Sequence, residues 1–115
     1  EWAHAMRLYD YLKDQCATIE LQGIDKPPAQ FASMQDMFTQ ALKHEKSITQ
    51  SINELVALAQ AENDHATQIM LQWFVTEQVE EEGKPTEIIA QIKMVGESTG
   101  GLFMIDHQLS KREAK

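Results

Sequence analysis

Cysteine is nearly absent from this sequence, because Cys16 is the only one among 115 residues. A single thiol forms neither an internal disulfide nor a thiolate metal site within the chain, which agrees with a reducing compartment. No signal or transit peptide is visible, and the longest apolar runs are far shorter than the roughly 20 residues that a membrane-spanning helix needs. We therefore expect a cytoplasmic protein that does not cross a membrane.

Basic residues are also few, with 10 Lys and Arg against 18 Asp and Glu, and the formal net charge is -8. Nucleic acid is not an expected partner, because the sequence has no cluster of basic residues to replace the counterions of phosphates. A chain with this negative charge is expected to bind cations rather than nucleic acid. The 43% of hydrophobic residues is enough for the core of one small domain. The composition thus predicts a single folded domain that attracts cations.

Glycine and proline are scarce, with five and three residues, and two of the prolines fall in the segment 17–32. Proline lacks a backbone donor and pushes the preceding residue out of the helical region, so 17–32 is expected to be a long connection. Residues 1–16 before it have helical spacing. Because no capping residue precedes this helix, we expect residue 1 to lie inside a longer helix whose beginning is missing.

A long helix is expected over residues 33–62. Ser33 is a favourable N-cap, and Asp36 follows at the third helical position in a variant of the capping box. The side chains expected to face the core recur in steps of three and four residues, as in a helical bundle. They are Met34, Phe38, Ala41, Glu45, Ile48, Ile52, Leu55 and Ala59.

A second long helix is expected over residues 65–96, antiparallel to the first because the link at 61–65 is short. Gly83 and Pro85 are expected to bend this helix without dividing it. A short final helix is expected over 101–112. The apolar members of the core stripe in the second long helix are Ile69, Met70, Trp73, Phe74, Ile88, Ile92 and Val95.

Polar side chains interrupt the apolar stripes of three helices, those expected over 1–16, 33–62 and 65–96, at a corresponding depth. An isolated carboxylate inside a bundle costs several kcal/mol or takes up a proton, and converging carboxylates cost more unless a cation is present. A set rich in oxygen ligands with one imidazole suits iron or manganese. The sequence therefore predicts a metal site built from Glu1, His4, Glu45, Glu77, Gln78 and Glu81.

Each of these patterns alone has a simpler explanation. A Glu-x-x-His pair occurs by chance, and the TEQVEEE stretch at 76–82 reads as a solvated face on which Glu80 and Glu82 are merely exposed. Glu45 is harder to explain in this way, because its stripe is apolar for several turns on both sides. The three interruptions together favour the metal site. The remaining histidines are expected at the surface: His44, His65 and His107.

Four stretches together resemble the prokaryotic non-haem ferritins: EWAHAMRLYDYL, LKHEKSITQSINEL, LQWFVTEQVEEE and GGLFMIDHQLS. The resemblance implies an all-α, ferritin-like four-helix bundle with a long crossover and a short fifth helix. Residues 1–16 would end the second helix, 17–32 would form the crossover, and 33–62, 65–96 and 101–112 would be the later helices. The first helix and most of the second would then be missing. It also implies a 24-subunit homo-oligomeric cage that stores iron mineral.

The resemblance further implies a two-iron centre that oxidises Fe(II) with O2 or peroxide. Glu1 would bridge the two irons and His4 would bind the first. Glu45 and Glu81 would bind the second iron. Gln78 would contact the irons or dioxygen. The missing segment would remove a Glu from the first iron's ligands.

A third iron site is implied nearby, formed by Glu77, Glu80 and Glu81. Haem is not expected, because Trp2 occupies the place of the haem-binding Met of bacterioferritins. Gln78-x-x-Glu81 likewise stands where bacterioferritins have a second Glu-x-x-His pair.

Two alternatives to a working ferritin remain open. A rubrerythrin-like oxidase with two irons or two manganese ions predicts a second Glu-x-x-His pair within the site, in the TEQVEEE stretch, where the sequence has Gln78-x-x-Glu81. A helical scaffold fragment derived from a ferritin would keep the assembly surfaces without the chemistry. Because three helices do not close a four-helix core, the bundle is expected to be completed by another copy or by an upstream fragment of the same protein.

Overall fold

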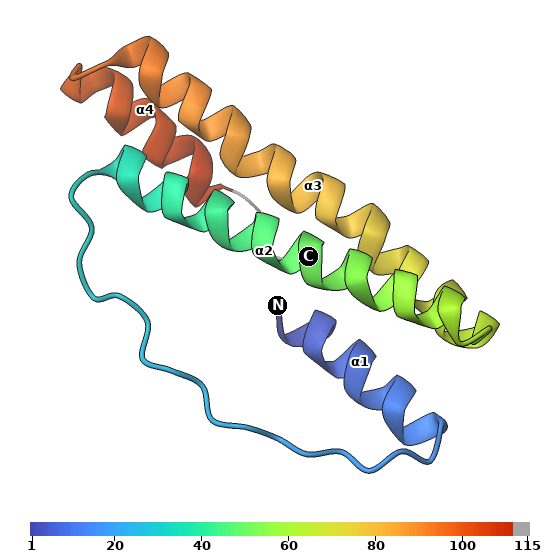
Figure 1. Ribbon diagram of the computed structural model, residues 1–115. Helices are drawn as coiled ribbons and strands as arrows, with labels where there is room; N and C mark the ends of the chain where they lie inside the picture. Colours follow the sequence, from blue (N-terminus) through green and yellow to red (C-terminus); the bar gives the residue numbers. More distant parts are fainter. Residues whose placement is uncertain (112–115) are drawn as a thin grey trace.

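The computed structural model describes residues 1–111 and contains four α-helices in that range (Figure 1). They are α1 (Trp2–Asp14), α2 (Met34–Ala61), α3 (His65–Val95) and α4 (Thr99–Ser110). Residues 1–111 include no β-strand, so the predicted all-α class is confirmed. Within the same residues no helix is both long and apolar enough to span a bilayer.

The long helices α2 and α3 run antiparallel, side by side, and form the centre of the molecule (Figure 1). A side-chain cap fixes the N-terminus of each helix. Ser33 Oγ accepts a hydrogen bond from the Asp36 N–H at 3.0 Å, and the Asp36 carboxylate accepts one from the Ala32 N–H at 3.1 Å. Between the helices Asn63 has a φ of 54°, and Asp64 caps α3 by accepting from the Thr67 N–H. These local signals fix where both helices begin.

The contact between α2 and α3 buries some of the side chains that the sequence placed in the core and leaves others exposed. Leu71 on α3 is 2% exposed, whereas Ile69, which was expected in the core, is 75% exposed. On α2, Ile52 is buried while Leu55 remains 47% exposed. Periodicity identifies residues that share a face, but the rotation of α3 about its axis decides which face meets α2. The prediction for Ile69 was therefore wrong.

Helix α3 continues unbroken through Pro85, as expected from the sequence. Proline has no N–H to donate to the carbonyl four residues back, so one hydrogen bond of the helix is absent at this point. The Pro85 ring is buried, and Ile88 and Ile92 follow on the same side of the helix. Burial of these side chains offsets the lost hydrogen bond and keeps the helix continuous.

Helix α4 folds back against the end of α3 (Figure 1). It begins at Thr99, two residues before the expected start, because Ser98 caps it by accepting from the Gly101 N–H at 3.2 Å. Ile105 of α4 joins a small core with Ile88 and Ile92 of α3. A Cβ atom at Gly101 would lie 2.6 Å from the Val95 Cβ, so this close crossing requires glycine.

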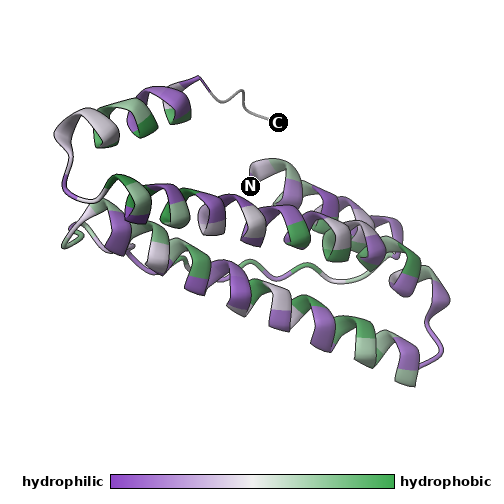
Figure 2. Cartoon of the chain, turned by 90° about the horizontal axis from the view of Figure 1, so that it is seen from above, coloured by the Kyte–Doolittle hydropathy of each residue, from purple (hydrophilic) through white to green (hydrophobic). Residues whose placement is uncertain are grey.

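Helix α1 lies against α3, in the half of the α2–α3 pair that is nearer their connecting turn (Figure 1). Tyr11 on α1 and Thr67 on α3 are joined by a 2.8 Å hydrogen bond. Thr67 donates its own hydroxyl proton to Asp64 at 2.5 Å, so the Tyr11 hydroxyl is the donor to Thr67. The extended segment 17–32 then returns the chain to the start of α2. Figure 2 shows hydrophobic and hydrophilic residues mixed along the helices, as in amphipathic elements.

Candidate metal centre

Three potential ligands from α1 and α3 meet in one cluster. The ligand atoms of His4, Glu77 and Glu81 all lie within 4.8 Å of one another, and the three side chains are half-buried. Glu77 and Glu81 are one turn apart on α3 and therefore share a face. The His4 Nε2 atom lies 3.9 Å from Glu77 Oε1. We name these three residues the His4 cluster.

Aromatic contacts fix the imidazole of His4. The Trp73 ring meets it edge-to-face, with 5.2 Å between centroids and an interplanar angle of 78°. The Phe74 ring has a similar orientation at 6.4 Å. The Arg7 guanidinium lies 3.9 Å from the centroid of Trp73, in cation–π geometry. These packed rings restrict the rotation of the His4 side chain.

Glu1 lies on the other side of the imidazole. Its carboxylate is 3.7 Å from His4 Nδ1, but its side chain is 82% exposed. His4 thus stands between two carboxylates, with Glu1 beside Nδ1 and Glu77 beside Nε2. The Glu1 carboxylate is open to solvent, whereas the Glu77 side chain is half-buried.

A cavity of about 470 Å³ adjoins His4 between α1, α2 and α3. Four predicted site residues line it, namely Glu1, His4, Glu45 and Gln78. Apolar side chains, among them Leu8, Ile52, Leu71 and Phe74, form much of the remaining wall. His44 also lines the cavity, although its side chain is exposed as the sequence suggested. The structure therefore brings these four polar groups to one hollow.

Gln78 connects the cavity to α2. It is a buried polar side chain, only 5% exposed, and the two N–H groups of its amide face three oxygen atoms of α2. The distances are 3.1 Å to the Glu45 carbonyl, 3.3 Å to Glu45 Oε2 and 3.1 Å to Thr49 Oγ1. Gln78 and Glu45 are therefore in direct contact.

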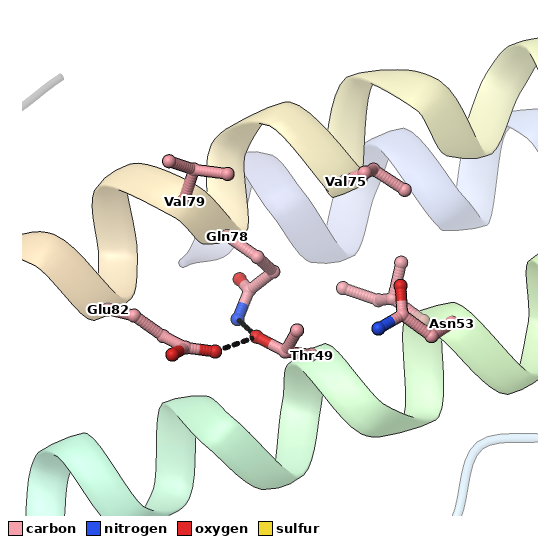
Figure 3. Close-up of a pocket in the computed structure, with 7 residues that line it drawn as sticks. Thr49, Asn53, Val75, Gln78, Val79 and Glu82 are labelled. Atoms are coloured by element: carbon pink, nitrogen blue, oxygen red, sulfur yellow. Dashed lines mark hydrogen bonds between the residues drawn. The ribbon is translucent and has the colours of Figure 1, made fainter.

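The simpler explanation, in which Glu82 is merely exposed, is wrong. Its side chain is half-buried, and its carboxylate accepts a 2.6 Å hydrogen bond from the Thr49 hydroxyl (Figure 3). The sequence contained a signal for both residues. Thr49 comes four residues after Glu45 and Glu82 four residues after Gln78, so each lies one turn along the face of a predicted site residue.

Glu80 lies at the margin of the cluster, with a side chain that is 52% exposed. Lys84, one turn further along α3, places its ammonium 3.9 Å from Glu80 and 3.5 Å from Glu81. The structure thus groups Glu77 and Glu81 with His4 and leaves Glu80 partly in solvent. The sequence reasoning did not identify Lys84 as a neighbour of the site.

The donor set favours hard cations. Carboxylate and amide oxygens with one imidazole match the ligands of iron and manganese, and the chain has no thiolate at this position. The several acids also need positive charge nearby, because converging carboxylates repel one another at short distance. A divalent cation would supply that charge more fully than the single ammonium of Lys84.

Comparison with known proteins gives one consistent family. The profile of the ferritin-like domain matches residues 1–95. The bacterial non-heme ferritin of Escherichia coli is 40% identical over 110 residues, which cover 96% of this chain and 67% of that protein. The bacterial non-heme ferritin of Campylobacter jejuni is 39% identical, covering 92% of this chain and 64% of that one. The open pore ferritin of Archaeoglobus fulgidus superposes with a TM-score of 0.95 at 35% identity, over 96% of this chain and 68% of that one.

Proposed function

This chain belongs to the ferritin family, and from that premise we propose that it stores iron by oxidising Fe(II) and depositing ferric mineral. The observation that carries the proposal is the His4 cluster, whose three ligand atoms lie within 4.8 Å of one another. The neighbouring cavity, onto which Glu45 and Gln78 open, supports the same conclusion. Iron is the substrate in this scheme.

Two Fe(II) ions would be bound side by side. Glu1 and His4 would bind the first ion and Glu45 and Glu81 the second, with Glu1 bridging the two. Carboxylates favour the higher charge of Fe(III) over that of Fe(II), so these ligands would promote loss of an electron. The half-buried position of His4 and Glu81 supports this role, because charge interactions are stronger where water is partly excluded.

The redox step balances with either oxidant. With O2, each of two Fe(II) ions loses one electron, and one O2 takes both electrons and two protons to give hydrogen peroxide. With hydrogen peroxide, the two electrons and two protons break the O–O bond and give two water molecules. Ferric ions then hydrolyse with release of protons and enter the mineral. Gln78 would contact the irons or the oxidant through its amide.

A third iron site would use Glu77, Glu80 and Glu81 and would pass product toward the mineral. The partial exposure of Glu80 supports a position on the exit side. Copies of the chain would assemble into a 24-subunit cage that encloses the mineral. Large exposed apolar side chains support such assembly, since they need cover in water: Trp2, Leu21, Ile24, Phe103 and Met104.

Rapid mixing of Fe(II) with the protein in aerated buffer tests the proposal. The Glu45→Ala/Glu81→Ala double variant should lose the fast phase of oxidation and follow the rate of Fe(II) in buffer. The matched control is Glu54→Ala/Glu87→Ala, which removes one exposed acid from each of the same helices. An unchanged fast phase in the first variant would overturn the assignment.

A further inference from the structure

A chain of hydrogen bonds links the proposed iron ligand Glu45 to Glu82, a carboxylate that the proposed reaction does not use. Gln78 Nε2 lies 3.3 Å from Glu45 Oε2 and 3.1 Å from Thr49 Oγ1. Thr49 Oγ1 in turn lies 2.6 Å from Glu82 Oε1. Figure 3 shows Thr49 between Gln78 and Glu82, at one wall of a hollow between α2 and α3.

The direction of each hydrogen bond follows from the groups involved. Thr49 has one hydroxyl proton and two acceptors within reach, Glu82 Oε1 at 2.6 Å and the Glu45 carbonyl at 3.1 Å. The shorter contact to a charged group is the stronger, so the proton goes to Glu82. Thr49 Oγ1 then presents a lone pair to Gln78, and only an N–H can face it.

This arrangement fixes the orientation of the Gln78 amide. Its nitrogen faces acceptors on α2, the Thr49 hydroxyl oxygen and the two Glu45 oxygens. Figure 3 shows the amide nitrogen turned toward Thr49 and the amide oxygen turned away from it. The oxygen is therefore the part of the amide that can face a cation, and a flipped amide would present an N–H there instead.

Glu82 also keeps the Thr49 hydroxyl proton away from the Glu45 carbonyl, which accepts a hydrogen bond from Gln78. Without a carboxylate at 82, the Thr49 proton would turn to the Glu45 carbonyl, where it would compete with the Gln78 N–H. A cation bound by Glu45 would further weaken the contact between Gln78 and Glu45 Oε2. Two hydrogen bonds would then still hold the Gln78 amide, one to Thr49 Oγ1 and one to the Glu45 carbonyl.

We propose that Glu82 is a positioning residue that acts through Thr49 to orient the Gln78 amide toward bound metal. The inference rests on the proposed function, since it takes the site of Glu45 and Gln78 to be a metal centre. It adds two residues, Thr49 and Glu82, that support the ligands without touching the metal. Loss of either should loosen the amide and change the metal's ligand environment.

Titration with Co(II) alone, followed by its visible absorption, tests this at the level of binding. Thr49→Val and Glu82→Met should weaken Co(II) binding by about two- to tenfold, the range of one net hydrogen bond, and should alter the spectrum. Thr49→Ser keeps the hydroxyl and should bind as the wild type does. Glu87→Met removes the same charge from an exposed position of α3 and should leave the spectrum unchanged.

The decisive measurement repeats the titration in a Gln78→Ala background. If Glu82 acts through Gln78, Glu82→Met should have no further effect there. An equal loss of affinity in both backgrounds would show a general charge effect and overturn the inference. A lowered melting temperature with unchanged Co(II) binding would also overturn it, because Glu82 would then only join α2 to α3. Absence of Co(II) binding by the wild type would overturn the proposed function itself, and the inference with it.

Discussion

The ammonium of Lys84 lies 3.5 Å from a carboxylate oxygen of Glu81, at the edge of the His4 cluster. It therefore places a positive charge beside a group that is proposed to bind iron. A cation entering the cluster must compete with this ammonium for Glu81. We therefore expect Lys84 to weaken metal binding and to stabilise the metal-free protein.

Replacing Lys84 by Gln should tighten binding of a divalent cation to the His4 cluster. The expected gain is about two- to fivefold, because ion pairs near the surface contribute about 0.2–1 kcal/mol. Isothermal titration with Zn(II) measures it. Lys93→Gln, which removes an exposed charge from the last turn of α3, is the control. Equal affinities of Lys84→Gln and wild type would show that Lys84 does not compete with metal.

Trp73 should report metal binding at His4. Its ring centroid lies 5.2 Å from that of the imidazole, so a paramagnetic ion on His4 would quench its fluorescence. Trp2 is 80% exposed and lies next to Glu1, so it is removed in the Trp2→Phe variant and Trp73 alone reports. Addition of Co(II) should quench the fluorescence of Trp2→Phe, and His4→Ala in the same background should abolish the quenching. Equal quenching with and without His4 would place the metal away from the cluster.

Gly101→Ala should destabilise the contact between α3 and α4. The added Cβ would lie 2.6 Å from Val95 Cβ, and overpacking of this kind costs about 1–3 kcal/mol. Gly100 is the matched control, because a Cβ there meets nothing within 4 Å. In urea unfolding, Gly101→Ala should be less stable than Gly100→Ala. Equal midpoints would mean that α4 can shift without cost.

The cap of α3 should make stability depend on pH in the acid range. The hydroxyl of Thr67, and then its backbone N–H, lower the pKa of Asp64. A carboxyl group with a lowered pKa stabilises the fold above its pKa in the unfolded chain, and this contribution is lost as pH falls through its pKa in the folded chain. Asp64→Ala should therefore lower the melting temperature at neutral pH, and the difference should shrink in acid. A constant difference across the titration would contradict this.

Local signals in the sequence predicted much of the fold. Ser33 was expected to cap the first long helix, and it caps α2. The turn expected at 61–65 contains Asp64, which caps α3. The continuity of α3 through Pro85 was also expected. Ser98 is a similar signal, and its cap starts α4 at Thr99, two residues before the expected start. Caps are readable in sequence because donor and acceptor are only two or three residues apart.

Contacts between helices were harder to predict. Spacing placed Glu77 and Glu81 on one face, and the structure brings His4 to the same face from α1. The exposure of Ile69 and the bond between Thr49 and Glu82 depend on how α3 is rotated against α2. That rotation is set by packing of side chains far apart in sequence, which periodicity within one helix does not determine.

Anomalous diffraction at the iron absorption edge tests the central claim most directly. Crystals would be soaked in Fe(II) without oxygen, measured, exposed to air and measured again. We expect one iron bonded to Glu1 and His4 and a second iron bonded to Glu45 and Glu81. Iron found only at other acidic surface groups, with none bonded to His4 or Glu81, would contradict it.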